Sequence, residues 1–75
     1  MSRGGVVMIS YRPLWQTMQD KNITQYSILK LGIDNKTLYR LKRNKNVTLL
    51  TIEKLCKLLD CSPNDIFEFV DDNLI

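Results

Sequence analysis

Residues 33–45 hold the side chains of this 75-residue chain that are best able to do chemistry. Lysine and arginine can bind phosphates or donate to guanine base edges, and an asparagine amide can pair with adenine. At helical spacing, the polar and basic side chains of this segment fall on one side and Leu38 and Leu41 on another. A short helix with a narrow apolar seam and a basic outer face suits the major groove of DNA.

The elements around this helix are predicted from capping and turn residues. Asp34 is a good N-cap, because its carboxylate can accept from the free N–H groups of the first turn. Thr24 to Leu31 is predicted to form the preceding helix, with Ile28 and Leu31 inward and Gly32 as the joining turn. A helix, a tight turn and a basic helix are typical of the helix-turn-helix motif.

Three further helices are expected. The first runs from about Pro13 to Lys21, with Trp15 in the core. The fourth runs from Leu49 to Leu59 after a Thr48 cap, with apolar positions at helical spacing that include Leu49. Ser62-Pro63 opens a fifth helix that carries Ile66, Phe67, Phe69 and Val70. Lys54 and Lys57 are expected on a solvated face.

These elements predict an all-α fold, a compact five-helix bundle. Residues 1–8 are expected to be a flexible leader, 9–70 the helix-turn-helix domain and 71–75 a frayed acidic tail. Val6 to Tyr11 has strand-like composition, and it would pair with a strand of a partner chain or lie unpaired.

Composition excludes several classes of protein. The net charge is +3, with basic residues concentrated between Lys30 and Lys45 and only acidic charges from Asp60 onward, a distribution that favours a polyanion partner. No apolar run approaches the roughly 20 residues of a membrane span, so a cytoplasmic protein without membrane contact is expected. The chain has two cysteines and no histidine, so no structural zinc site is expected. No cofactor is expected, and no small-molecule ligand is evident, because so short a chain shows no effector pocket. No catalytic motif is visible, so an enzyme is not expected.

Several blocks of the sequence resemble the Cro/phage-repressor class of helix-turn-helix proteins, the XRE family, with its lambda-repressor-like DNA-binding fold. The resemblance covers about residues 9–70. It is carried by Ile23-Thr24-Gln25, by Gly32 to Leu41 and by Thr51 to Ile66. One residue fewer than is usual in that family separates the Thr-Gln pair from the turn glycine, which implies a shorter or differently wound second helix.

The resemblance implies roles for individual residues. Gln25 would contact a phosphate, Asn35 and Lys36 would approach base edges, and Tyr39 and Arg40 would act one helical turn further on. Arg43 and Lys45 would flank the backbone. The complete set of expected DNA-binding residues is Gln25, Asn35, Lys36, Thr37, Tyr39, Arg40, Arg43 and Lys45.

The sequence therefore predicts sequence-specific binding of double-stranded DNA by a bacterial or phage transcriptional regulator, a repressor rather than an activator. A homodimer on a palindromic site is expected, because one small domain makes few contacts. Its surface would come from Val6–Tyr11 or from Phe67, Phe69 and Val70. The alternative is a protein-interaction module on the same fold, such as an antitoxin or anti-repressor, for which the acidic C-terminal end would suit a basic partner.

Overall fold

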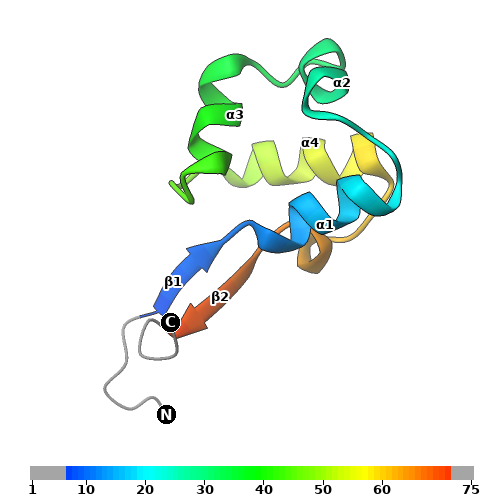
Figure 1. Ribbon diagram of the computed structural model, residues 1–75. Coiled ribbons are helices and arrows are strands. Elements are labelled where there is room, and N and C mark those ends of the chain that lie inside the picture. The colour runs from blue at the N-terminus through cyan, green and yellow to red at the C-terminus, as the bar shows by residue number, and fades with distance from the viewer. Residues whose placement is uncertain (1–6, 72–75) are drawn as a thin grey trace.

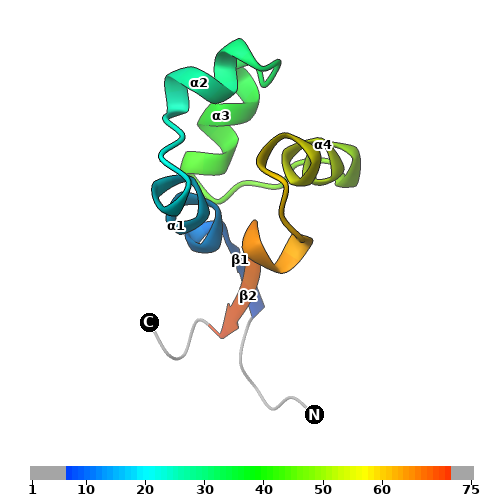
Figure 2. The same ribbon diagram turned by 90° about the vertical axis from the view of Figure 1, so that its right-hand side faces the viewer.

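The computed structural model describes residues 7–71 of the chain (Figure 1). Four helices and a two-stranded sheet form the fold in this order: β1 (Val7–Ser10), α1 (Arg12–Asp20), α2 (Gln25–Lys30), α3 (Asn35–Lys42), α4 (Leu49–Leu59), the 3₁₀ turn η1 (Pro63–Asp65) and β2 (Glu68–Asp71). In Figures 1 and 2, α1 lies beneath the α2–α3 pair and the sheet projects away from the helices. Helix α4 crosses behind the pair in Figure 1 and lies beside it in Figure 2.

The predicted helix starts are confirmed by their caps. Thr24, Asp34 and Thr48 each accept a hydrogen bond from the backbone N–H three residues further on, at 2.8 to 3.1 Å. Each bond satisfies one N–H group that has no partner within its helix. The starts of α2, α3 and α4 are therefore fixed by residues inside one helical turn.

The core gathers one apolar face from every helix. Among residues 7–71, its buried members are Tyr11, Leu14, Met18, Ile28, Ile33, Leu38, Leu41, Ile52, Leu55, Leu59 and Ile66. The inward positions predicted for α3 are confirmed, and Trp15 is half-buried against this core rather than inside it. Leu31 and Leu49 were predicted inward but are 50% and 80% exposed; Leu31 follows the last residue of α2, and Leu49 is the first residue of α4.

The predicted fifth helix is wrong. Ser62 and Asp65 do form the expected start, since Asp65 Oδ2 lies 3.2 Å from both the Ser62 nitrogen and its hydroxyl. However, only the short turn η1 follows, and the chain then extends as β2. Phe69 and Val70 are among the side chains favoured in strands, and β1 offers them a partner. The fold is therefore mostly helical with a small sheet, not an all-α five-helix bundle.

The small sheet joins the two ends of the described chain. β1 and β2 pair antiparallel, with Val7 opposite Asp71 and Ile9 opposite Phe69. The strand-like composition of Val6–Tyr11 is thus confirmed over Val7–Ser10, but its partner is a strand of the same chain. The strands include Val7 and Met8 of the expected leader and Asp71 of the expected tail. The remainder of those two segments, 1–6 and 72–75, lies outside the described residues.

Candidate nucleic-acid interface

A left-handed residue sets the angle between α2 and α3. Gly32 has a φ of 117°, which side chains strongly disfavour, so a glycine is suited to this position. The backbone N–H of Gly32 donates to the Leu29 carbonyl at 3.2 Å, and that of Ile33 donates to the Ile28 carbonyl at 3.1 Å. These bonds close α2 and release the chain at Asp34, where α3 begins. The predicted helix-turn-helix arrangement is present.

The N-terminal end of α3 has a carboxylate cap. Asp34 Oδ1 accepts from the Thr37 backbone N–H at 2.8 Å. Hydrogen bonds from the Thr37 side chain and backbone lower the pKa of Asp34, and the charges of Lys36 and Lys54 act in the same direction. The carboxylate therefore stays ionised at neutral pH, where its charge also suits the positive end of the helix dipole.

A lysine from another helix contacts the turn. Lys54 of α4 donates from Nζ to the Gly32 carbonyl oxygen at 2.9 Å. The expectation that Lys54 lies on a solvated face is confirmed, since the residue is exposed, but the sequence did not indicate its bond to the turn. Helical periodicity shows that Lys54 lies off the apolar seam of α4, but it carries no signal for a turn 22 residues away.

The C-terminal end of α3 is held by a buried tyrosine. Tyr11 donates from its hydroxyl to the Lys45 carbonyl at 2.7 Å, and its backbone N–H donates to Asn44 Oδ1 at 3.0 Å. The side chain is completely buried, and this burial raises the pKa of Tyr11. Asn44 adopts a left-handed φ of 55°, which ends α3 and turns the chain toward α4. The sequence analysis placed Tyr11 only at the end of the strand-like segment Val6–Tyr11 and did not indicate this buried contact.

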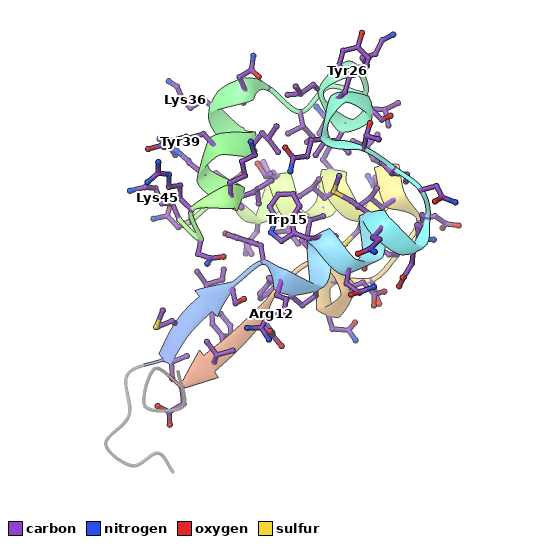
Figure 3. All side chains as sticks on the ribbon, in the orientation of Figure 1. Arg12, Trp15, Tyr26, Lys36, Tyr39 and Lys45 are labelled. Carbon is purple, nitrogen blue, oxygen red and sulfur yellow. The ribbon has the colours of Figure 1, made fainter. Side chains whose placement is uncertain are left out.

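The outer face of α3 presents the predicted basic surface. Asn35, Lys36, Tyr39, Arg40 and Arg43 are exposed, and Thr37 is half-buried beside its cap. Figure 3 shows Lys36, Tyr39 and Lys45 on the same side of the molecule, directed away from α4. Seven of the eight predicted residues therefore gather on α3 and the loop that follows it.

The cations of this surface form no ion pairs with carboxylates in the described part of the chain. Within residues 7–71, none of Lys36, Arg40, Arg43 and Lys45 forms a salt bridge. The guanidinium of Arg43 instead lies over the Tyr39 ring, 5.0 Å from its centroid. A stacked guanidinium keeps its charge and its donors while it is restricted in orientation. An open hollow beside it is lined by Arg40, Asn44, Lys45, Asn46 and Ile9. Such a surface can attract and orient a polyanion.

The remaining predicted residue lies on α2. Gln25 is the first residue of this six-residue helix and is exposed. Its neighbour Tyr26 is 69% exposed, and the ammonium of Lys30 lies 5.3 Å from the centroid of that ring. The spacing of this pair repeats that of Tyr39 and Arg43. Figure 3 shows Tyr26 at a different part of the surface from Tyr39. The sequence signal that could have indicated the Tyr26–Lys30 pair is a tyrosine followed four residues later by a cation.

A disulfide, a metal site and a membrane-spanning helix would each require features that residues 7–71 do not show. Cys56 and Cys61 are free thiols, and burial is the main cause that raises the pKa of Cys61. No three side chains of His, Cys, Asp or Glu gather there as a metal site would require. The longest helix in this part of the chain has 11 residues, too few to cross a bilayer.

Comparison with known proteins agrees with this geometry. The crystal structure of the transcriptional regulator VanUg superimposes with a TM-score of 0.82 and 26% sequence identity, and the match covers 95% of both chains. No curated protein sequence matches significantly. Residues 13–72 match the model of a family described as the Cro/C1-type HTH DNA-binding domain, which spans both helices of the motif and the basic face of α3. The chain belongs to the Cro/C1-type helix-turn-helix DNA-binding family.

Proposed function

We propose that this protein is a transcriptional regulator that binds a specific double-stranded DNA sequence through α3. The observation that carries the proposal is the exposed basic face of α3, whose cations form no salt bridge within residues 7–71. The helix follows the Asp34 cap, and this face lies opposite the buried Leu38 and Leu41. An α-helix fits the major groove, and such a helix can present its first two turns to base edges.

The predicted contacts divide into two roles. We assign Asn35, Lys36 and Arg40 to base edges, with Tyr39 against a thymine methyl or a phosphate. Lysine or arginine can donate to guanine O6 and N7, and asparagine can pair with adenine. We assign Arg43 and Lys45, with Gln25 from α2, to the phosphate backbone. Thr37 lies in the first turn of α3, where its backbone N–H bonds to the Asp34 cap, and we include it among the DNA-binding residues. Repression by occluding a promoter is the proposed mode, since it requires only DNA binding.

Fluorescence anisotropy of labelled duplexes over a salt series tests the proposal. Randomised and AT-rich palindromic pools would be used, and the bound fraction would be sequenced. Enrichment of a defined site with steeply salt-dependent affinity is expected, because bound phosphates release counterions. Absence of binding even at low salt would refute DNA recognition and favour the protein-interaction module.

Two substitutions separate the assigned roles. Arg40→Ala should weaken binding to the selected site by about 1–3 kcal/mol and relax the preference at one base position. Lys45→Ala should weaken binding to all sequences alike and reduce the salt slope by about 1. Equal losses that do not depend on salt would show that these roles are wrongly assigned.

We also propose that two copies of the chain bind together on a palindromic site. Half-sites about one helical turn, roughly 34–36 Å, apart would place an α3 helix in each of two successive major grooves. The two segments predicted as dimer surfaces form one projecting sheet, in which Val7 and Phe69 are each 64% exposed. A two-stranded sheet is marginally stable alone, so packing against a second copy would stabilise it. A second copy that packs on this sheet would cover the exposed Val7 and Phe69 side chains.

Size-exclusion chromatography with light scattering measures this assembly. A dimer, free or on DNA, is expected at tens of micromolar protein. Phe69→Ser should shift the equilibrium toward the monomer, whereas Leu50→Ser, at a residue that is 75% exposed on α4, should leave it unchanged. A wild-type monomer both free and on DNA would refute the dimer.

A further inference from the structure

The Gly32 carbonyl is an acceptor that the helix-turn-helix backbone does not use. No backbone N–H of residues 7–71 donates to it, whereas Lys54 Nζ lies 2.9 Å away. This carbonyl belongs to the residue that redirects the chain from α2 into α3. A donor from α4 at this point therefore connects the turn directly to a helix that belongs to neither half of the motif.

The turn glycine also leaves room for the ammonium group. A Cβ atom built on Gly32 would lie 3.0 Å from Lys54 Nζ and 3.3 Å from its Cε. The absence of a side chain at Gly32 therefore permits both the positive φ and the close approach of the Lys54 side chain. The charge of Lys54 also helps to lower the pKa of Asp34, although the two side chains form no salt bridge within the described residues.

The other lysine of the same face behaves differently. Lys57 lies one turn further along α4 and pairs with Glu53 at 3.6 Å, with both side chains largely exposed. Within residues 7–71, its side chain forms no hydrogen bond to the turn. Lys54 and Lys57 therefore have the same charge and helix but different partners, which makes Lys57 a matched control.

We propose that Lys54 is a positioning residue for the DNA-reading helix: its bond to the Gly32 carbonyl fixes the start of α3 relative to α4. Asn35 and Lys36, the first residues of α3, are presented to DNA in the orientation that this bond sets. The proposal rests on the proposed function, because it concerns the same helix. It requires no contact between Lys54 and DNA.

The first measurement uses the free protein. Amide hydrogen exchange by NMR would compare the wild type with Lys54→Met, which keeps the length of the side chain but removes the ammonium. The Thr37 and Leu38 amides in the first turn of α3 should exchange about three- to tenfold faster, the effect of one ordinary hydrogen bond. Lys57→Met should leave these rates unchanged, and Lys54→Arg, which retains donors, should restore most of the protection.

The second measurement uses the selected DNA site. Lys54→Met should weaken specific binding by about three- to tenfold, change non-specific binding little and leave the salt slope at the wild-type value. A lysine that bound a phosphate directly would instead lower the slope by about 0.9 when removed. Loss of slope with unchanged exchange, or no change in either measurement, would overturn the proposal.

The two measurements also separate this proposal from the proposed function. If the wild-type protein binds no DNA, the proposed function fails, and with it the role of Lys54 in presenting α3 to DNA. If the wild type binds DNA but the exchange rates of Lys54→Met equal those of the wild type, only the positioning role fails.

Discussion

The two ends of α3 are held by contacts of opposite character. At the N-terminal end, the Asp34 cap and the bond from Lys54 to Gly32 are both exposed to solvent. At the C-terminal end, Tyr11 is completely buried and donates to the Lys45 carbonyl from inside the core. The end assigned to base reading is thus held by charged, water-accessible groups, and the end assigned to the backbone is anchored in the core.

This difference separates stability from recognition. A buried hydrogen-bonded aromatic contributes to the free energy of unfolding of the whole domain, because removing it leaves a cavity and unpaired groups. Exposed charged bonds contribute less to unfolding, because water competes for them. Substitutions at the C-terminal end should therefore act first on the fold, and those at the N-terminal end first on the geometry of α3.

Tyr11→Ala should have the largest effect. Removal of a buried aromatic ring typically lowers the free energy of unfolding by about 3–5 kcal/mol. Urea denaturation followed by circular dichroism would measure this loss. Trp15→Ala is the comparison, since Trp15 is only half-buried and should have a smaller effect. A smaller loss for Tyr11→Ala than for Trp15→Ala would contradict the central place of Tyr11 in the core.

Gly32→Ala should rank second. Its φ of 117° disfavours any side chain, and strain of this kind costs of order 1–3 kcal/mol. The Lys54 side chain can move away from the new Cβ, so the same substitution should also remove the bond to the turn. Thermal unfolding would measure the first effect and amide exchange in α3 the second. An unchanged melting temperature would show that the turn relaxes without strain.

Tyr11→Phe isolates one hydrogen bond at the buried end. The ring stays in place, but the Lys45 carbonyl loses its donor, so a loss of about 0.5–1.5 kcal/mol in unfolding free energy is expected. Urea denaturation would again supply the value. Amides at the C-terminal end of α3 should lose protection, whereas those near Asp34 should not. Equal loosening of both ends would mean that α3 responds as one rigid unit.

Asp34→Asn should have the smallest effect at neutral pH, because asparagine also caps helices well. The difference should appear on acidification. The folded-state pKa of Asp34 is lowered, so its contribution is complete above the unfolded pKa and is lost as the pH falls through the folded pKa. Melting temperatures between pH 7 and about pH 2.5 should therefore show any advantage of aspartate shrinking below its ordinary pKa. A constant difference over this range would contradict ionic capping.

Local patterns succeeded where the deciding contacts lie within one helical turn. The caps at Thr24, Asp34 and Thr48 bond to residues three positions away, so residue types at short spacing were sufficient. The same holds for the turn at Gly32 and for the basic face of α3. These features position the candidate interface, so the exposed face on which most of the expected DNA-binding residues lie could be predicted.

Helical spacing failed at the C-terminal segment for a physical reason. Phe67, Phe69 and Val70 were assigned to a helix because Ser62 and Pro63 give a good helix start. The outcome depended on β1, whose Ile9 lies opposite Phe69 in the sheet. A strand partner about 60 residues away leaves no mark on local periodicity, and tertiary context commonly overrides propensity.

The sequence by itself determined the helix starts, the left-handed turn at Gly32 and the basic outer face of α3, because each depends on residues within about four positions. Only the tertiary structure decided the sheet and the two contacts that hold α3. Lys54 reaches Gly32 across 22 positions, and Tyr11 reaches Lys45 across 34. Such contacts form only when packing of the apolar faces brings distant segments together, so no local pattern records them.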